Sequence, residues 1–124
     1  MTTSNDDDRL RACIQAMRDC EGDTQRYSEA DVAFHVTVAE ISGNPLLRSF
    51  NAVITVALRG LMNQTARGVK AAEKNHAGTT GRHEKLVKAI EKRDEIAAAQ
   101  AMLKVIAGGQ RFAKYRAKLV HKAR

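Results

Sequence analysis

The sequence contains no tryptophan and only one proline, and aromatic residues make up 4% of its 124 residues. Proteins that bind single-stranded nucleic acids stack the bases on aromatic side chains, so this scarcity argues against a base-stacking protein. Alanine, leucine, lysine, arginine and glutamate run through most of the chain, with Pro45 as the single residue that breaks helices strongly. This composition favours helices over strands.

The sequence also lacks any long apolar segment. No run approaches the roughly 18 residues that a membrane-spanning helix needs. The first ten residues, MTTSNDDDRL, are acidic and contain no apolar stretch, so they do not resemble a secretory signal. These absences predict a protein without membrane association and with a cytoplasmic location.

Only two cysteines occur, Cys13 and Cys20, and both fall in the first predicted helix. At about 1.5 Å per residue they lie about 10 Å apart along the helix axis, which is too far for a disulfide bond. Both lie on the apolar face of that helix. We therefore interpret them as core residues, with reactive thiols as the alternative.

The net charge of +7 is unevenly distributed along the chain. Residues 1–50 carry 5 basic and 9 acidic side chains (−4), residues 51–104 carry 10 and 5 (+5), and residues 105–124 carry 6 and 0 (+6). A basic tail of this kind can follow the phosphates of a nucleic acid. It is also typical of a solvated helix end, where cations suit the negative end of the helix dipole.

The spacing of apolar residues predicts an all-α protein of about 124 residues in a single domain, folded as an antiparallel helical bundle. Ser28 resembles the start of a capping box, Gly43 is placed to end a helix, and Asn44 and Asp94 are placed to cap the helices that follow them. The segment 66–80 contains two glycines and mixed charge, and it is interpreted as fraying helix and loop. The predicted helices cover about residues 6–21, 28–41, 45–65, 81–92 and 94–107.

Asp31 and His35 are four residues apart in the second predicted helix, so they project from the same face within reach of one ion. A carboxylate and a neutral imidazole are good ligands for a divalent metal such as Zn, Ni or Mn. A plain surface ion pair explains the same spacing. His83, at the start of the fourth predicted helix, adds a third side chain close to a core face. The three residues would form a two-histidine, one-carboxylate set inside the bundle.

Two segments of the sequence resemble the FadR C-terminal (FCD) domain of GntR-family transcriptional regulators. Residues 31–45, DVAFHVTVAEISGNP, contain an aspartate, a Phe-His pair and Ser-Gly-Asn before a long helix. Residues 83–103, HEKLVKAIEKRDEIAAAQAML, contain a histidine, an Ala-Ile pair, an Arg-Asp junction and a methionine. The two motifs agree with the family in their spacing, and the match covers about residues 8–107.

The resemblance implies a single effector domain over residues 1–124, with a core at about 8–107 and a basic helical tail at 110–124. In this family the helical bundle encloses a ligand cavity, and the proteins are usually dimers. Many members hold a divalent metal with one aspartate and three histidines, and a small organic acid binds above or in place of it. In the family, ligand binding alters the orientation of winged-helix DNA-binding domains. We expect this chain to lack such a domain. The implied function is therefore a ligand-sensing transcriptional regulator and not an enzyme.

One departure from the family pattern concerns the metal ligands. The last metal histidine of the family falls three residues after the methionine, a position that Val105 occupies in this sequence. Valine cannot ligate, so the resemblance carries over to Asp31, His35 and His83 only. The remaining histidines, at positions 76 and 121, do not match the pattern. A three-ligand site would be completed by water or by a ligand carboxylate.

Recognition of a metabolite carboxylate calls for an arginine or for the metal itself. Arg48 and Arg59 share a polar stripe on the third predicted helix, where they either face the cavity as ligand contacts or lie exposed.

Two functions from other classes remain as alternatives. A basic helical protein would bind nucleic acid through its tail, with strongly salt-dependent affinity. A metal-dependent enzyme would need a general base beside the metal, and Glu84 projects about 100° around the helix from its neighbour His83.

Overall fold

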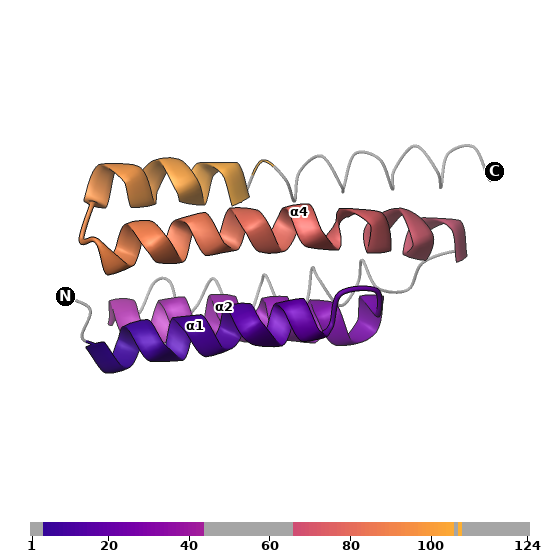
Figure 1. Ribbon diagram of the computed structural model, residues 1–124, viewed down its shortest axis with the longest axis horizontal. Helices are drawn as coiled ribbons and strands as arrows, with labels where there is room; N and C mark the ends of the chain where they lie inside the picture. Colours follow the sequence, from indigo (N-terminus) through magenta and orange to yellow (C-terminus); the bar gives the residue numbers. More distant parts are fainter. Residues whose placement is uncertain (1–3, 44–65, 106, 108–124) are drawn as a thin grey trace.

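The structure, a computed structural model, describes residues 4–43, 66–105 and 107, and it confirms the prediction of an all-α protein over these residues (Figure 1). The described helices are α1 (Ser4–Asp19), α2 (Thr24–Ser42), α4 (Ala66–Glu91) and a last helix over residues 95–105. In Figure 1, α1 and α2 run antiparallel as one pair, and α4 runs antiparallel to the last helix. The predicted helix over 45–65, with Asn44, Arg48 and Arg59, lies outside the described residues, as does the basic tail at 110–124.

The second helix begins about one turn earlier than the sequence analysis predicted. Asp23, not Ser28, is the residue before the first turn of α2, and its carboxylate accepts a hydrogen bond from the backbone N–H of Arg26 at 3.2 Å. An aspartate cap satisfies one of the N–H groups that the first turn leaves without a partner. The other end of α2 agrees with the prediction, because Gly43 adopts φ 66° and its N–H bonds back to the carbonyl of Glu40.

The interpretation of residues 66–80 as fraying helix and loop was wrong. These residues form the first half of α4, which runs without interruption through Gly78 and Gly81. Each glycine costs a helix about 1 kcal/mol relative to alanine, a penalty that tertiary packing can offset. The packing is visible at His76 and Thr80, which are both buried against α2. As a consequence, His83 lies in the last third of α4 and not at a helix start.

A single cluster of apolar side chains joins α1, α2 and α4. From α1, Leu10, Ile14 and Met17 recur at the spacing of one helix face and are buried. Phe34 of α2 is fully buried among them, and Leu86 and Val87 contribute from α4. The whole buried cluster consists of Leu10, Ile14, Met17, Tyr27, Ala30, Phe34, Leu86 and Val87.

Both cysteines are free and pack against this cluster with partial burial. The thiol of Cys13 lies 3.5 Å from the hydroxyl of Thr37 on α2. Their position at the edge of the core agrees with the interpretation of these residues as packing residues.

The connection after α4 is short and tightly tied to α1. Arg93 adopts a left-handed conformation with φ 58°, and its guanidinium contacts both carboxylate oxygens of Asp7 at 3.1 and 3.2 Å. Asp94 then accepts a hydrogen bond from the N–H of Ala97, which confirms its predicted role as a cap. Among the described residues, none of the helices has the length and apolar character needed to cross a membrane.

Candidate metal centre

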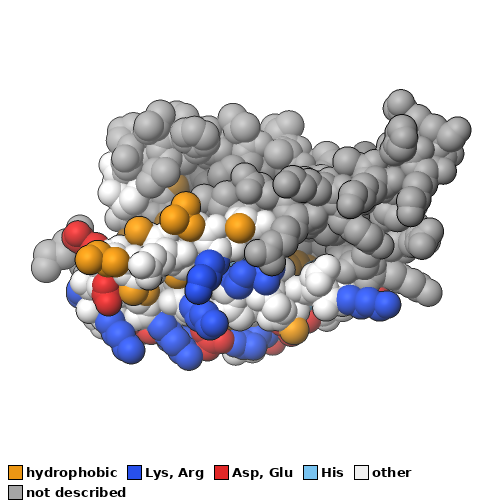
Figure 2. Space-filling model, turned by 90° about the horizontal axis from the view of Figure 1, so that it is seen from above, with side chains coloured by type: hydrophobic (Ala, Val, Ile, Leu, Met, Phe, Trp, Pro, Cys, Tyr) orange, Lys and Arg blue, Asp and Glu red, His pale blue; other side chains and the backbone are white. Residues whose placement is uncertain are grey.

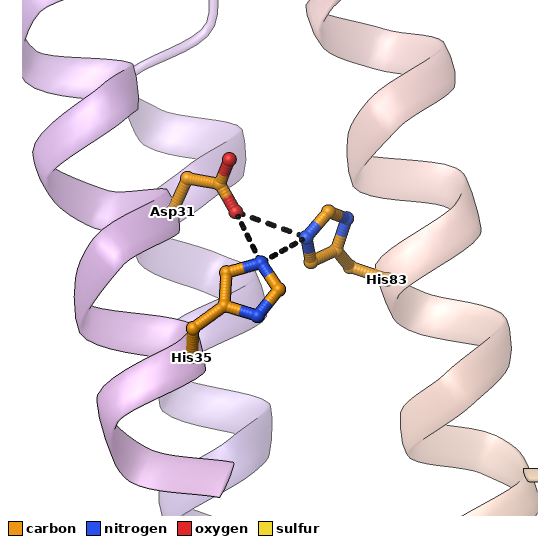
Figure 3. Close-up of side chains that lie close together, drawn as sticks. All are labelled: Asp31, His35 and His83. Carbon is orange, nitrogen blue, oxygen red and sulfur yellow. Dashed lines mark hydrogen bonds and ion pairs between the residues drawn. The ribbon is translucent and has the colours of Figure 1, made fainter. Parts of the chain in front are cut away.

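The three residues singled out in the sequence come together between α2 and α4 (Figure 3). Asp31 and His35 lie one turn apart on α2, and His83 reaches toward them from α4. Oδ1 of Asp31 lies 3.1 Å from Nε2 of His35 and 3.0 Å from Nε2 of His83. The two Nε2 atoms are 3.4 Å apart. Three ligand atoms from two helices therefore meet at one point.

The carboxylate oxygen at this point is buried and has no hydrogen-bond partner among the described residues. Nε2 of His35 and Nε2 of His83 lie 3.1 and 3.0 Å from Oδ1 of Asp31, but neither forms a hydrogen bond with it. A buried polar atom without a hydrogen bond is costly, by about 1–3 kcal/mol for a neutral group and more for a charged one. The contacts at Oδ1 are thus electrostatic contacts without the directionality of hydrogen bonds.

The orientation of His83 is set by the backbone of its own helix. Nδ1 of His83 lies 2.7 Å from the carbonyl oxygen of Thr79. Because a carbonyl only accepts hydrogen bonds, Nδ1 carries the proton, and in the neutral ring the lone pair is on Nε2. That lone pair faces Asp31. A backbone carbonyl that fixes the tautomer in this way is a usual support for a metal-ligating histidine.

Phe34 packs against both imidazole rings from the core side. It is fully buried and makes edge-to-face contacts with His83 at a centroid distance of 4.8 Å and with His35 at 5.5 Å. His83 is itself only 2% exposed, whereas the side chains of Asp31 and His35 are 16% and 18% exposed. The aromatic ring limits the movement of the two imidazoles, which keeps the ligand atoms in place.

Asp31 is held in its charged form. Burial by itself raises the pKa of this carboxyl, but the contacts with His35 and His83 together outweigh burial, so the pKa lies well below its usual range. Asp31 is therefore an anion at neutral pH. An anionic oxygen beside two imidazole nitrogens is a donor set suited to a divalent cation.

The spacing of the three atoms fits a metal ion. Metal–ligand bonds of roughly 2.0–2.1 Å separate neighbouring ligand atoms by about 3.0 Å in octahedral and about 3.4 Å in tetrahedral geometry. The observed separations of 3.0, 3.1 and 3.4 Å span this range. In the part of the chain that the structure describes, no further histidine, cysteine, aspartate or glutamate joins the group. Val105, at the position of the family's remaining histidine, is a buried apolar residue of the last helix.

His76, which the family pattern does not include, has a structural role that the sequence analysis missed. It is buried, stacks on Tyr27 at 4.0 Å, and its Nδ1 accepts a hydrogen bond from the N–H of Gly22 at 3.0 Å. The hydroxyl of Tyr27 lies 2.9 Å from Thr80 Oγ1 and 3.1 Å from the carbonyl oxygen of His76. These contacts join α4 to α2 through Tyr27 and to the turn between α1 and α2 through Gly22. Positions 76, 80 and 83 have the spacing of one helix face. This spacing could have indicated that His76 is buried, but only if residues 66–80 are treated as helix.

One other residue weighed from the sequence, Glu84, is not at this centre. Glu84, the only acidic residue considered as a general base, forms ion pairs with Arg11 and Arg18 of α1. Arg48 and Arg59, the predicted ligand contacts, lie outside the described residues.

Comparison with known proteins agrees with the resemblance. A family model described as the FCD domain matches residues 1–108. The galactonate operon transcriptional repressor of Escherichia coli (strain K12) is 30% identical over 112 residues, which are 90% of this chain and 48% of that protein. The chain thus spans about half the length of this relative, and no solved structure gives a significant match. Because the family model covers most of the chain, the protein belongs to the FCD family, whose members are effector domains of GntR-type transcriptional regulators, and it is a regulatory domain rather than an enzyme.

Proposed function

We propose that this chain binds a divalent metal through Asp31, His35 and His83 and senses a small organic acid at that metal. The observation that carries the proposal is the convergence of three ligand atoms on a buried carboxylate oxygen without a hydrogen bond. A cation is the partner that satisfies this oxygen and both Nε2 lone pairs at once. Zn, Ni and Mn are the ions that suit two imidazoles and one carboxylate.

The effector would bind the coordination positions that the protein does not fill. Three protein ligands leave at least one position open, and the apolar side chain at Val105 cannot occupy it. A carboxylate oxygen is a good ligand for the same ions. The name of the relative connects that protein to an operon for galactonate, a hydroxy acid, so sugar acids are the first compounds to test. Arg48 and Arg59 are proposed as further contacts to the carboxylate.

In the regulator, this domain would act on DNA through a winged-helix domain and as a pair of identical subunits. Ligand binding can shift such an assembly only if it favours one arrangement of the two subunits over another. Both the pairing and the coupling to DNA are proposals that rest on family membership. Sedimentation equilibrium over a range of protein concentrations tests the pairing, and a strictly monomeric chain would contradict it.

Metal content tests the site itself. The untagged protein is loaded separately with Zn, Ni and Mn, dialysed, and measured by elemental mass spectrometry. We expect close to one ion per chain in the wild type, little in His35→Ala, and no change in His121→Ala, a histidine outside the family pattern. Equal metal content in the wild type and His35→Ala, or no retention of any of the three ions, would overturn the metal proposal.

Calorimetric titration then tests the effector. Galactonate and a panel of other small carboxylates are titrated into metal-loaded protein and into protein stripped with a chelator. We expect saturable binding of at least one acid that is much weaker after stripping. Binding that is equal in both preparations would show that the acid does not need the metal.

A further inference from the structure

A groove of about 220 Å³ lies between α4 and the last helix, and none of the three candidate metal ligands lines it. Three alanines form its apolar floor, and its polar lining consists of Arg82, Lys85, Gln100 and Lys104. Lys85 projects from α4 and Lys104 from the last helix, so the cations come from both walls. Figure 2 looks onto the side of the molecule where the last helix lies, and it shows Lys and Arg side chains gathered in the middle of the described surface.

The lining carries three positive charges and no acidic side chain. None of these three cations forms an ion pair within the described residues, whereas Arg9, Arg11, Arg18 and Arg93 each pair with a carboxylate there. Like charges grouped without counter-charges raise the local positive potential and attract anions. The groove therefore carries positive charge that no carboxylate of its lining balances.

Arg82 shows a second feature of an anion site. One terminal nitrogen of its guanidinium donates a hydrogen bond to Thr79 Oγ1 at 3.0 Å, which orients the group. Its Nε is buried and has no acceptor within the described residues. A buried N–H without an acceptor destabilises the protein, and more strongly when the group is charged. An oxyanion in the groove offers such an acceptor, and the planar donors of arginine match carboxylate and phosphate oxygens.

We propose that this groove binds a small molecule through a phosphate or carboxylate group, at a site separate from the candidate metal centre. Arg82 supplies oriented hydrogen bonds, and Lys85 and Lys104 supply charge from opposite walls. The alanine floor accommodates the apolar part of the ligand. Lys85 and Lys104 are exposed, so their attraction for an anion weakens as salt concentration rises.

Equilibrium dialysis at low ionic strength tests the site with two probes, radiolabelled inorganic phosphate and radiolabelled succinate. Each probe is measured with the wild type, with a groove variant (Lys85→Ala together with Lys104→Ala), and with Lys88→Ala as the matched control. Lys88 is an exposed lysine of α4 that does not line the groove. A fourth protein, His35→Ala, reports binding at the candidate metal centre. Circular dichroism confirms that each variant remains helical.

At least one probe should bind the wild type at about one site per chain, more weakly as sodium chloride is added. The groove variant should lose roughly tenfold or more in affinity, because it removes the two lysine charges that attract the anion from opposite walls. Lys88→Ala and His35→Ala should retain wild-type affinity. The probe that binds more tightly identifies the preferred group. The proposal is overturned if neither probe binds at millimolar concentration, if Lys88→Ala loses as much affinity as the groove variant, or if binding disappears only in His35→Ala.

Discussion

The backbone carbonyl of Thr79 lies 2.7 Å from Nδ1 of His83 and thereby fixes the proton on that nitrogen. The same residue accepts a hydrogen bond from Arg82 through its hydroxyl. One turn of α4 therefore orients both the imidazole that faces Asp31 and the guanidinium that lines the basic groove. This shared support depends on a regular helix at position 79, within the segment 66–80 that the sequence indicated to be fraying helix and loop.

Replacing Asp31 by asparagine should weaken metal binding far more than it changes the fold. The substitution keeps the shape of the side chain and removes the anionic oxygen that both imidazoles face. Loss of outer-shell partners typically costs about 10–100-fold in metal affinity, so loss of a direct ligand should cost at least about 100-fold. Competition with a chromophoric chelator measures the affinity. An Asp31→Asn protein with wild-type affinity would mean that the ion is held elsewhere.

Unfolding at different pH values should reveal the buried neutral His76. Burial lowers the pKa of His76 against the opposing effect of nearby carboxylates, and its Nδ1 is an acceptor that a second proton would remove. Because the folded pKa lies below the unfolded value of about 6.5, the unfolded state binds more protons at acidic pH. The stabilisation is therefore present above about pH 6.5 and is lost as the pH falls through the folded pKa.

The matched variant for this prediction is His76→Asn, whose amide oxygen can accept the same hydrogen bond without titrating. Urea unfolding of both proteins, after metal removal, gives the free energy of unfolding from pH 7.5 to pH 5. The wild type should lose more stability over this range than His76→Asn. Parallel pH profiles for the two proteins would exclude His76 as the titrating group.

Truncation of Phe34 should be among the most destabilising single changes in the described part of the chain. The side chain is fully buried and contacts both imidazoles of the candidate metal centre. Phe34→Ala should lower the free energy of unfolding by about 3–5 kcal/mol. Leu103→Ala, at a residue that is 66% exposed, should change it by no more than about 0.5 kcal/mol. Chemical denaturation compares the two, and similar losses would contradict the placement of Phe34 in the core.

The start of α2 can be tested by two alanine substitutions. Asp23→Ala removes the carboxylate that accepts from Arg26 and should reduce stability by about 1 kcal/mol. Ser28→Ala lies inside the helix in the structure, so it should be neutral or slightly stabilising, since alanine is the better helix former. If thermal or urea unfolding shows that Ser28→Ala loses stability and Asp23→Ala does not, then Ser28 is the cap.

Much of the local structure follows from the sequence because helix periodicity and capping are short-range effects. The apolar spacing of Leu10, Ile14 and Met17 predicted the buried face of α1. Gly43 and Asp94 were recognised as helix boundaries from their residue types alone. The spacing of Asp31 and His35 placed two ligands on one face of α2, and the position of His83 near a predicted core face added it to the set before the family resemblance was considered.

Tertiary structure alone decided the continuity of α4 and the geometry of the candidate metal centre. Local propensity disfavours a helix through Gly78 and Gly81, yet the burial of His76 and Thr80 against Tyr27 outweighs that penalty. The distance between Asp31 and His83 depends on how α2 packs against α4, and the grouping of cations in the groove depends on how the last helix folds back. A sequence specifies which side chains share a helix face, but contacts between helices arise only when those faces pack together.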